Sequence, residues 1–173
     1  MKNLNLEGYI RNIPDFPKPG ILFRDITTLL KDKKAFKATI DALVAKYKDK
    51  KIDTVVAVES RGFIFGSAVA YKLGAGLVPV RKKGKLPAKT NSVTYELEYG
   101  TDTLEIHHDA ITPKSRVLIV DDLLATGGTV KAVKDLVLQL KGNIVGIAFL
   151  IELSALKGKD KLKGDPVFAL IKY

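Results

Sequence analysis

Hydrophobic positions along the chain fall into short apolar runs that alternate with stretches of helical spacing. The runs at 54–58, 117–120 and 144–153 are rich in Val and Ile and have the length of buried strands. Residues 33–47 place apolar side chains three or four positions apart, which predicts an amphipathic helix. Strands separated by helices predict right-handed βαβ units, and therefore a mostly parallel sheet covered by helices on both faces.

The remaining segments extend this α/β pattern. Two further helices are predicted over 62–74 and 129–142, two parallel strands over 76–80 and 166–171, and an antiparallel strand pair over 92–100 and 102–109. The stretch before that pair, RKKGKLPAKTN, is polar and basic and has no apolar period. We therefore interpret this stretch and the strand pair as an insertion into a single α/β domain.

The composition changes this picture little but excludes several kinds of site. With 46% hydrophobic and 28% charged residues, the chain has an ordinary globular composition. There is no cysteine, which excludes disulfides, thiolate metal sites and a cysteine nucleophile. No apolar run approaches the roughly 20 residues of a membrane span, and the N-terminus lacks the apolar stretch of a secretory signal. We therefore expect a cytoplasmic protein without a membrane partner.

The net charge of +10, from 29 basic and 19 acidic residues, suggests an anionic partner. Nucleic acid, a membrane surface and a phosphorylated small molecule all satisfy this condition. The block RKKGK at 81–85 contains no acidic residue, so it could be a solvated hairpin, a nucleic-acid patch or a contact for a small anion.

The most specific chemistry follows the strand at 117–120, where the chain reads DDLLATGGT. The second half of this string opens the next predicted helix, so its backbone N–H groups can converge on an anion, helped by the helix dipole. Its glycines let the chain approach a phosphate closely, and its threonines add hydroxyl donors. The predicted phosphate loop consists of Ala125, Thr126, Gly127, Gly128 and Thr129.

Asp121 and Asp122 stand between the strand and this loop. Paired carboxylates accept hydrogen bonds well from neighbouring hydroxyls, which suggests a ribose beside the phosphate. Because ionised carboxylates are costly to bury, we expect the strand to end before them and both to face water.

The string VLIVDDLLATGGT resembles the phosphoribosyl-diphosphate-binding motif of type I phosphoribosyltransferases. Four further segments resemble, in the same order, those of the adenine phosphoribosyltransferases: PDFPKPGILFRDIT, VAVESRGFIFG, RKKGKLP and YELEYG. The resemblance implies one domain over 1–173. Within it, a hood segment at 1–30 binds the base, and a flexible catalytic loop with its strand pair spans 81–107.

The resemblance also assigns roles to individual residues. Asp121 and Asp122 would hold the ribose and the phosphate loop its 5-phosphate. The group expected at the diphosphate comprises Glu59, Ser60, Arg61, Arg81, Lys82 and Lys85. The group expected at adenine comprises Leu22, Phe23, Arg24 and Leu123. Glu98 resembles the catalytic acid/base, Tyr99 lies beside it on the loop that closes the site, and Mg²⁺ is the implied cofactor.

We therefore expect conversion of adenine and phosphoribosyl diphosphate to AMP and diphosphate, by a homodimer. One alternative is transfer to a 6-oxopurine (xanthine, hypoxanthine or guanine). Another is a regulator that senses phosphoribosyl diphosphate and binds nucleic acid, as the positive charge allows. The chain has no room before residue 14 for a winged helix and retains Glu98, so we expect no nucleic-acid partner.

Overall fold

A computed structural model describes residues 4–96 and 100–173 of the chain. The chain divides into two compact units, Met1–Ala42 and Leu43–Tyr173, and the division falls within helix α2 (Lys33–Tyr47). The first unit begins with the elements η1 (Leu6–Tyr9), β1 (Arg11–Ile13), β2 (Phe23–Asp25) and α1 (Thr27–Lys31). Strands β1 and β2 pair in an antiparallel hairpin, with Ile13 opposite Phe23. The hydrophobic pattern did not predict these strands, because three residues are too few to establish a period.

The second unit contains a seven-stranded sheet in the order β5-β6-β4-β3-β7-β8-β9. Its strands are β3 (Thr54–Val58), β4 (Gly76–Lys82), β5 (Thr90–Glu96), β6 (Thr101–His107), β7 (Arg116–Leu124), β8 (Asn143–Glu152) and β9 (Val167–Lys172). The neighbouring pairs β4–β3, β3–β7, β7–β8 and β8–β9 are parallel, whereas β6 pairs antiparallel with both β4 and β5. The predicted mostly parallel α/β fold is confirmed.

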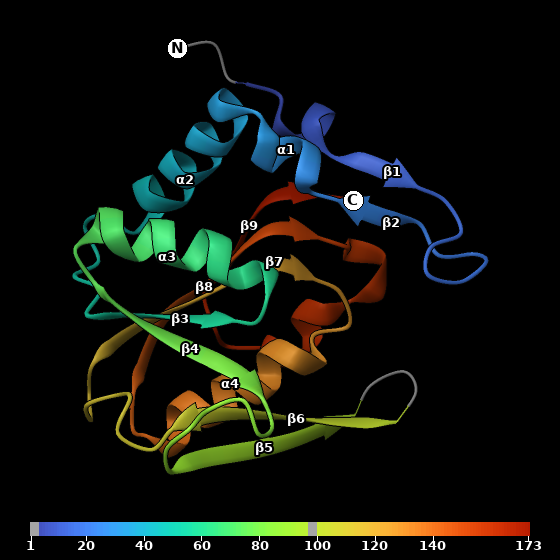
Figure 1. The fold of residues 1–173 in the computed structure, drawn as a ribbon. Helices are drawn as coiled ribbons and strands as arrows, with labels where there is room; N and C mark the ends of the chain where they lie inside the picture. The colour runs from blue at the N-terminus through green and yellow to red at the C-terminus, as the bar shows by residue number, and fades with distance from the viewer. Residues whose placement is uncertain (1–3, 97–99) are drawn as a thin grey trace. The chain divides into compact units, whose positions relative to one another are not determined.

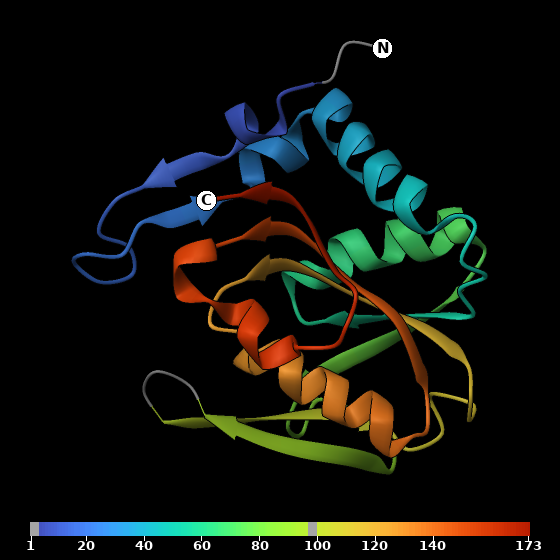
Figure 2. The same cartoon turned by 180° about the vertical axis from the view of Figure 1, so that it is seen from behind.

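Helices α3 (Arg61–Leu73) and α4 (Gly128–Gln139) follow β3 and β7 and lie on opposite faces of the sheet (Figures 1 and 2). Helix α3 ends at Gly74, whose φ of 66° is the left-handed conformation that a glycine adopts without strain. From β3 the chain crosses to β4 on one side, and from β7 it crosses to β8 on the other. The order of the strands therefore reverses between β3 and β7, which is where open α/β sheets bind ligands.

The central strands are buried on both faces, as parallel strands between helices must be. Val55–Val58 of β3 and Val117–Val120 of β7 are almost entirely removed from solvent. One face of the sheet packs in a hydrophobic cluster with α4, through Val130, Val133 and Val137 among others. This packing fixes the carboxyl ends of β3 and β7 relative to each other.

The predicted insertion differs from the structure in its boundaries. Strand β4 continues through Lys82, so the basic block begins inside a strand rather than in a loop. Arg81 and Lys82 extend β4 because they pair antiparallel with Glu105 and Leu104 of β6. The strand pair itself is confirmed as β5 and β6.

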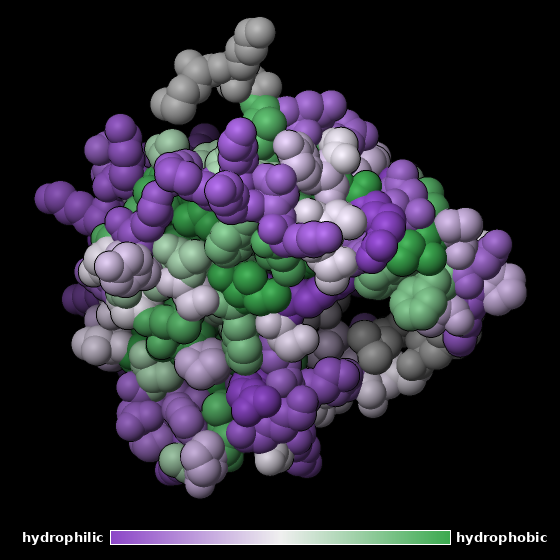
Figure 3. Space-filling view, turned by 45° about the horizontal axis from the view of Figure 1, so that its top comes forward, coloured by the Kyte–Doolittle hydropathy of each residue, from purple (hydrophilic) through white to green (hydrophobic). Residues whose placement is uncertain are grey.

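Hydrophilic residues cover much of the face drawn in Figure 3, with hydrophobic residues in smaller groups between them. No helix in the described part of the chain combines the length and the apolar character needed to cross a bilayer.

Candidate functional site

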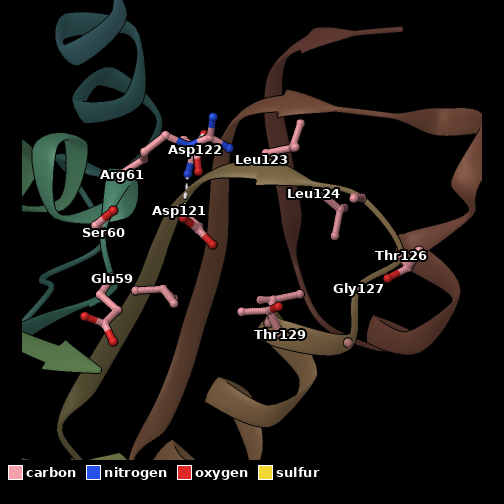
Figure 4. Close-up of a pocket in the computed structure, with 14 residues that line it drawn as sticks. Glu59, Ser60, Arg61, Asp121, Asp122, Leu123, Leu124, Thr126, Gly127 and Thr129 are labelled. Carbon is pink, nitrogen blue, oxygen red and sulfur yellow. Dashed lines mark hydrogen bonds and ion pairs between the residues drawn. The ribbon is translucent and has the colours of Figure 1, made fainter. Parts of the chain in front are cut away.

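A cavity of about 350 Å³ opens at the carboxyl ends of β3 and β7, where the strand order reverses. Two stretches of chain line it, 58–61 after β3 and 121–130 from the end of β7 to the start of α4 (Figure 4). The structure therefore brings together the predicted ribose residues, the predicted phosphate loop, the turn Glu59–Arg61 and Leu123. The two stretches are about sixty residues apart in the sequence.

The two aspartates lie inside β7 and not beyond its end, because the strand continues to Leu124. Asp122 is only 5% exposed, so the expectation that both carboxylates face water is wrong. Successive side chains of a strand point to opposite faces, and Figure 4 shows Asp121 and Asp122 on opposite sides of the β7 ribbon. The prediction failed because β7 continues to pair with β8 beyond the aspartates: Leu123 lies opposite Ile151, and Leu124 lies opposite Glu152.

Burial raises the pKa of both carboxyl groups. For Asp121 the pKa lies well above its ordinary value, first because burial disfavours the charged form and then because Asp122 carries a like charge. For Asp122 burial also raises the pKa, but the guanidinium of Arg61 acts against it, with its Nε 2.9 Å from Asp122 Oδ2. Ionisation of the pair therefore has an electrostatic cost, which Arg61 and nearby N–H groups offset in part.

Gly62 makes room for the carboxylate of Asp121. A Cβ at position 62 would lie 2.7 Å from Asp121 Oδ1 and 3.2 Å from the carbonyl oxygen of Val120. Asp121 Oδ1 therefore rests against the first turn of α3, where the helix dipole favours negative charge, and it also accepts the N–H of Asp122 at 2.8 Å. No role was predicted for Gly62 from the sequence, where its only signal is its place directly after Arg61.

The predicted phosphate loop leads into the start of α4. Gly127 has φ 79°, which a residue with a side chain adopts only at a cost, and α4 begins at the next residue. The carbonyl of Gly127 accepts the N–H of Lys131 at 3.0 Å, so the N–H groups of the first turn remain directed out of the helix start. The geometry is that of an anion-binding loop at a helix N-terminus.

The basic block does not line the cavity in this structure. Instead, two of its cations pair with Glu59. The Oε2 atom of Glu59 lies 3.2 Å from the Nε of Arg81 and 3.0 Å from the Nζ of Lys85. Although burial raises the pKa of Glu59, hydrogen bonds from the Lys82 N–H, Lys85 and Arg81 bring it below the ordinary value. Lys82 pairs through its side chain with Asp102 at 2.8 Å. Glu59 was predicted to bind the diphosphate, but in this structure its carboxylate binds Arg81 and Lys85, which were predicted for the same role. These contacts join the turn at 59–61 to the start of the insertion.

Residues predicted to bind the base belong to the first unit, apart from Leu123. Phe23 and Arg24 lie in β2, and Leu22 directly before it is 46% exposed. The ring of Phe23 meets that of Phe16 edge to face, with centroids 5.1 Å apart. This hairpin presents an aromatic ring and main-chain groups on one short strand, and its role at the base stays a prediction.

Two further predictions concern positions that the structure leaves undescribed. Glu98 and Tyr99 lie outside the described residues, so their roles remain predictions. Within the described ranges 4–96 and 100–173, no group of three or more His, Asp or Glu residues could hold a metal ion.

A family model described as a phosphoribosyl transferase domain matches residues 27–169 of the chain. The chain is 60% identical over 168 residues to an adenine phosphoribosyltransferase of Acidobacterium capsulatum, an alignment that covers 97% of this chain and 93% of that protein. The predicted family resemblance is confirmed.

Solved structures agree with this result. The crystal structure of adenine phosphoribosyltransferase from Thermoanaerobacter pseudethanolicus has a TM-score of 0.94 and 55% identity, covering 97% of this chain and 98% of that chain. The enzyme from Saccharomyces cerevisiae, complexed with an imino-altritol bisphosphate and adenine, has a TM-score of 0.92 and 45% identity, covering 95% of this chain and 96% of that chain.

Proposed function

This chain belongs to the phosphoribosyltransferase family, and we propose that it transfers the phosphoribosyl group of phosphoribosyl diphosphate to adenine, forming AMP and diphosphate in purine salvage. One observation carries the proposal: a single cavity joins a phosphate loop at the start of α4 to two adjacent aspartates near the end of β7. The high identity to adenine phosphoribosyltransferases supports adenine as the base.

In this proposal the substrate lies along β7 and the loop that follows it. The N–H groups of Ala125–Thr129 hold the 5-phosphate, and Asp121 and Asp122 accept hydrogen bonds from the ribose hydroxyls. The turn Glu59–Arg61 lies beside the aspartates on the same cavity wall, which suits it to the diphosphate. The three parts of the substrate thereby meet three adjacent stretches of the chain.

The reaction breaks the bond from ribose C1 to the diphosphate oxygen and forms one from C1 to the adenine nitrogen. Positive charge develops on the sugar, and the two carboxylates stabilise it. Negative charge develops on the leaving diphosphate, and Arg61 offsets it. Arg81, Lys82 and Lys85 can also bind the diphosphate once their ion pairs with Glu59 and Asp102 have broken. We assign Glu98 to accept the proton that adenine loses, with Tyr99 on the same closing loop.

Magnesium fits the donors at this site. Mg²⁺ in phosphate-transferring enzymes is held by one or two carboxylates together with substrate oxygens, so two adjacent aspartates suffice when the substrate supplies the remaining ligands. When bound, the ion would neutralise charge on the diphosphate.

For the base, we assign Phe23 to stack on the purine, the main chain of Leu22 and Arg24 to read its edge, and Leu123 to cover the other side. Leu123 lines the cavity next to the aspartates, which supports its part of this assignment. We further propose one functional domain with residues 1–30 as the base-binding hood and 81–107 as the catalytic loop region, acting as a homodimer in the cytoplasm.

The proposal is tested by incubating the protein with phosphoribosyl diphosphate, Mg²⁺ and each purine in turn, and measuring nucleotide and diphosphate. We expect AMP and diphosphate in equal amounts from adenine, and little product from hypoxanthine, guanine or xanthine. Turnover of a 6-oxopurine without AMP formation would show that the base is misassigned. Failure with every base, together with salt-sensitive nucleic-acid binding, would favour a regulator instead.

A further inference from the structure

The phosphate loop touches a segment that follows it by about thirty residues. This segment contains two short helices, η2 (Ser154–Leu156) and η3 (Gly158–Leu162), and η3 lies against α4 (Figure 2). Gly158 opens η3 and is buried, although the residues around it are mostly lysines. The backbone of the phosphate loop therefore packs against the backbone at Gly158, which lies outside the sequence motif that predicts phosphate binding.

The contact between the two segments leaves no room for a side chain on either one. A Cβ on Gly158 would lie 2.2 Å from the carbonyl oxygen of Ala125 and 3.0 Å from the amide nitrogen of Gly127. A Cβ on Gly127 would lie 2.4 Å from the carbonyl oxygen of Gly158. Contacts this short with backbone atoms cannot be relieved by turning a side chain, so one of the two backbones would have to move.

The segment that carries Gly158 is anchored on both sides. Leu162 is 1% exposed and belongs to the same hydrophobic cluster as Val130 of α4. Lys159 Nζ lies 3.0 Å from Glu152 Oε2 at the end of β8. Beyond the segment, Lys134 Nζ of α4 lies 2.6 Å from Asp165 Oδ2. Gly158 is thus fixed to the helix whose N-terminus forms the phosphate loop.

We propose that Gly158 is a positioning residue for the phosphate loop: its backbone supports Ala125–Gly127 from behind and fixes the directions of the loop N–H groups. This inference rests on the proposed function, in which that loop holds the 5-phosphate. A loop of Ala, Thr and Gly has few side chains to lock its conformation, and glycine loses more freedom than other residues when it is ordered. Support from a second backbone supplies the rigidity that the loop's own sequence lacks.

The substitution Gly158→Ala tests this inference, with Gly164→Ala as its matched control. Gly164 lies shortly after η3 and has φ 91°, but a Cβ at this position would have no other atom within 4 Å. The control therefore strains the backbone without pressing on the loop. Binding of ribose 5-phosphate and, separately, of diphosphate is measured by calorimetry with Mg²⁺, alongside the melting temperature.

We expect Gly158→Ala to weaken ribose 5-phosphate binding by roughly tenfold or more, since a displacement of about 1 Å at a binding group has effects of this size. Diphosphate binding, which we assign to the turn at 59–61, should change by less than about twofold. Gly164→Ala should lower the melting temperature and leave both affinities unchanged. Equal weakening of both ligands in Gly158→Ala, or no weakening of either, would overturn the inference.

A second variant decides the question if Gly158→Ala does not fold. Lys159→Gln removes the ion pair with Glu152 at a half-exposed position and should weaken ribose 5-phosphate binding roughly two- to fivefold, again without affecting diphosphate. An unchanged affinity in this variant would overturn the inference. If the unmodified protein itself fails to bind ribose 5-phosphate, the proposed function is at fault and not the role of Gly158.

Discussion

Asp121 and Asp122 directly follow Val117–Val120 in β7, and these four residues have no exposed surface. Two like charges at this position oppose folding, because burial and mutual repulsion both favour their neutral forms. Arg61 offsets part of the cost for Asp122, whereas the pKa of Asp121 is raised further. We therefore expect the ionised form of Asp121 to oppose folding, and in our proposal the same carboxylate binds the ribose.

Replacing Asp121 by Asn should stabilise the protein and impair its reaction. The variant removes a charge that burial disfavours, and its amide can donate a hydrogen bond toward Asp122, so we expect a melting temperature several degrees higher without ligand at about pH 7. It also loses a charged acceptor for a ribose hydroxyl, which should lower kcat/KM for phosphoribosyl diphosphate roughly 10- to 100-fold. Thermal denaturation and steady-state kinetics measure the two effects.

The pH dependence provides the control. A carboxyl group whose pKa is raised by folding contributes stability below its unfolded pKa and loses it as the pH rises through the folded pKa. The gain from Asp121→Asn should therefore be present near neutral pH and disappear in acid. Asp122→Asn gives up the ion pair with Arg61 and should gain less. A stability gain for Asp121→Asn that does not depend on pH would contradict this account.

At the scale of elements, the carboxylate of Asp25 links β2 to both β1 and α1. Asp25 Oδ1 accepts the N–H of Thr27 at 2.9 Å, and Asp25 Oδ2 accepts the Nε–H of Arg11 at 2.9 Å. The N–H of Thr27 has the largest effect in lowering the pKa of Asp25, and Arg11 adds to it. The strand that carries Phe23 is thereby tied to α1 and to β1.

Asp25→Asn should weaken adenine binding selectively. The amide has one acceptor oxygen and no charge, so it cannot bind both Thr27 and Arg11 as the carboxylate does. If the hairpin loses about 1.4 kcal/mol of stability in its binding conformation, the KM for adenine rises roughly tenfold. The KM for phosphoribosyl diphosphate should stay within about twofold, as should both constants in the exposed control Asp49→Asn. Because folding lowers the pKa of Asp25, its contribution is present above the unfolded pKa and is lost as the pH falls through the folded one. Equal changes in both KM values would exclude a base-specific role.

The elements that were predictable are those with a local signal. Residues 33–47 and 54–58 have a clear hydrophobic period or run, and the structure reproduces both ranges. The end of β7 was not predictable, because pairing with β8 draws Asp121 and Asp122 into the strand. Gly158 gave no local signal, since its importance depends on the carbonyl of Ala125 on another segment. Contacts of this kind exist only in the folded chain.

At the scale of the whole molecule, the net charge of +10 suits a substrate with several phosphate charges, and magnesium completes the match. We expect a chelator such as EDTA to abolish AMP formation and added Mg²⁺ to restore it. The melting temperature without substrate should not change, because in our proposal the ion is held mainly through the substrate. Full turnover in excess chelator would contradict the proposed role of the ion.

The ion pairs of Glu59 affect how strongly small anions can bind to the protein. Its carboxylate engages Arg81 and Lys85, much as Asp122 engages Arg61. A small anion arriving alone must break one ion pair to form another of similar strength, so it gains little. In our proposal, phosphoribosyl diphosphate also contacts the predicted phosphate loop and the aspartates, and these contacts offset that loss. We therefore expect this internal ion pairing to weaken the binding of small anions to Arg61, Arg81 and Lys85.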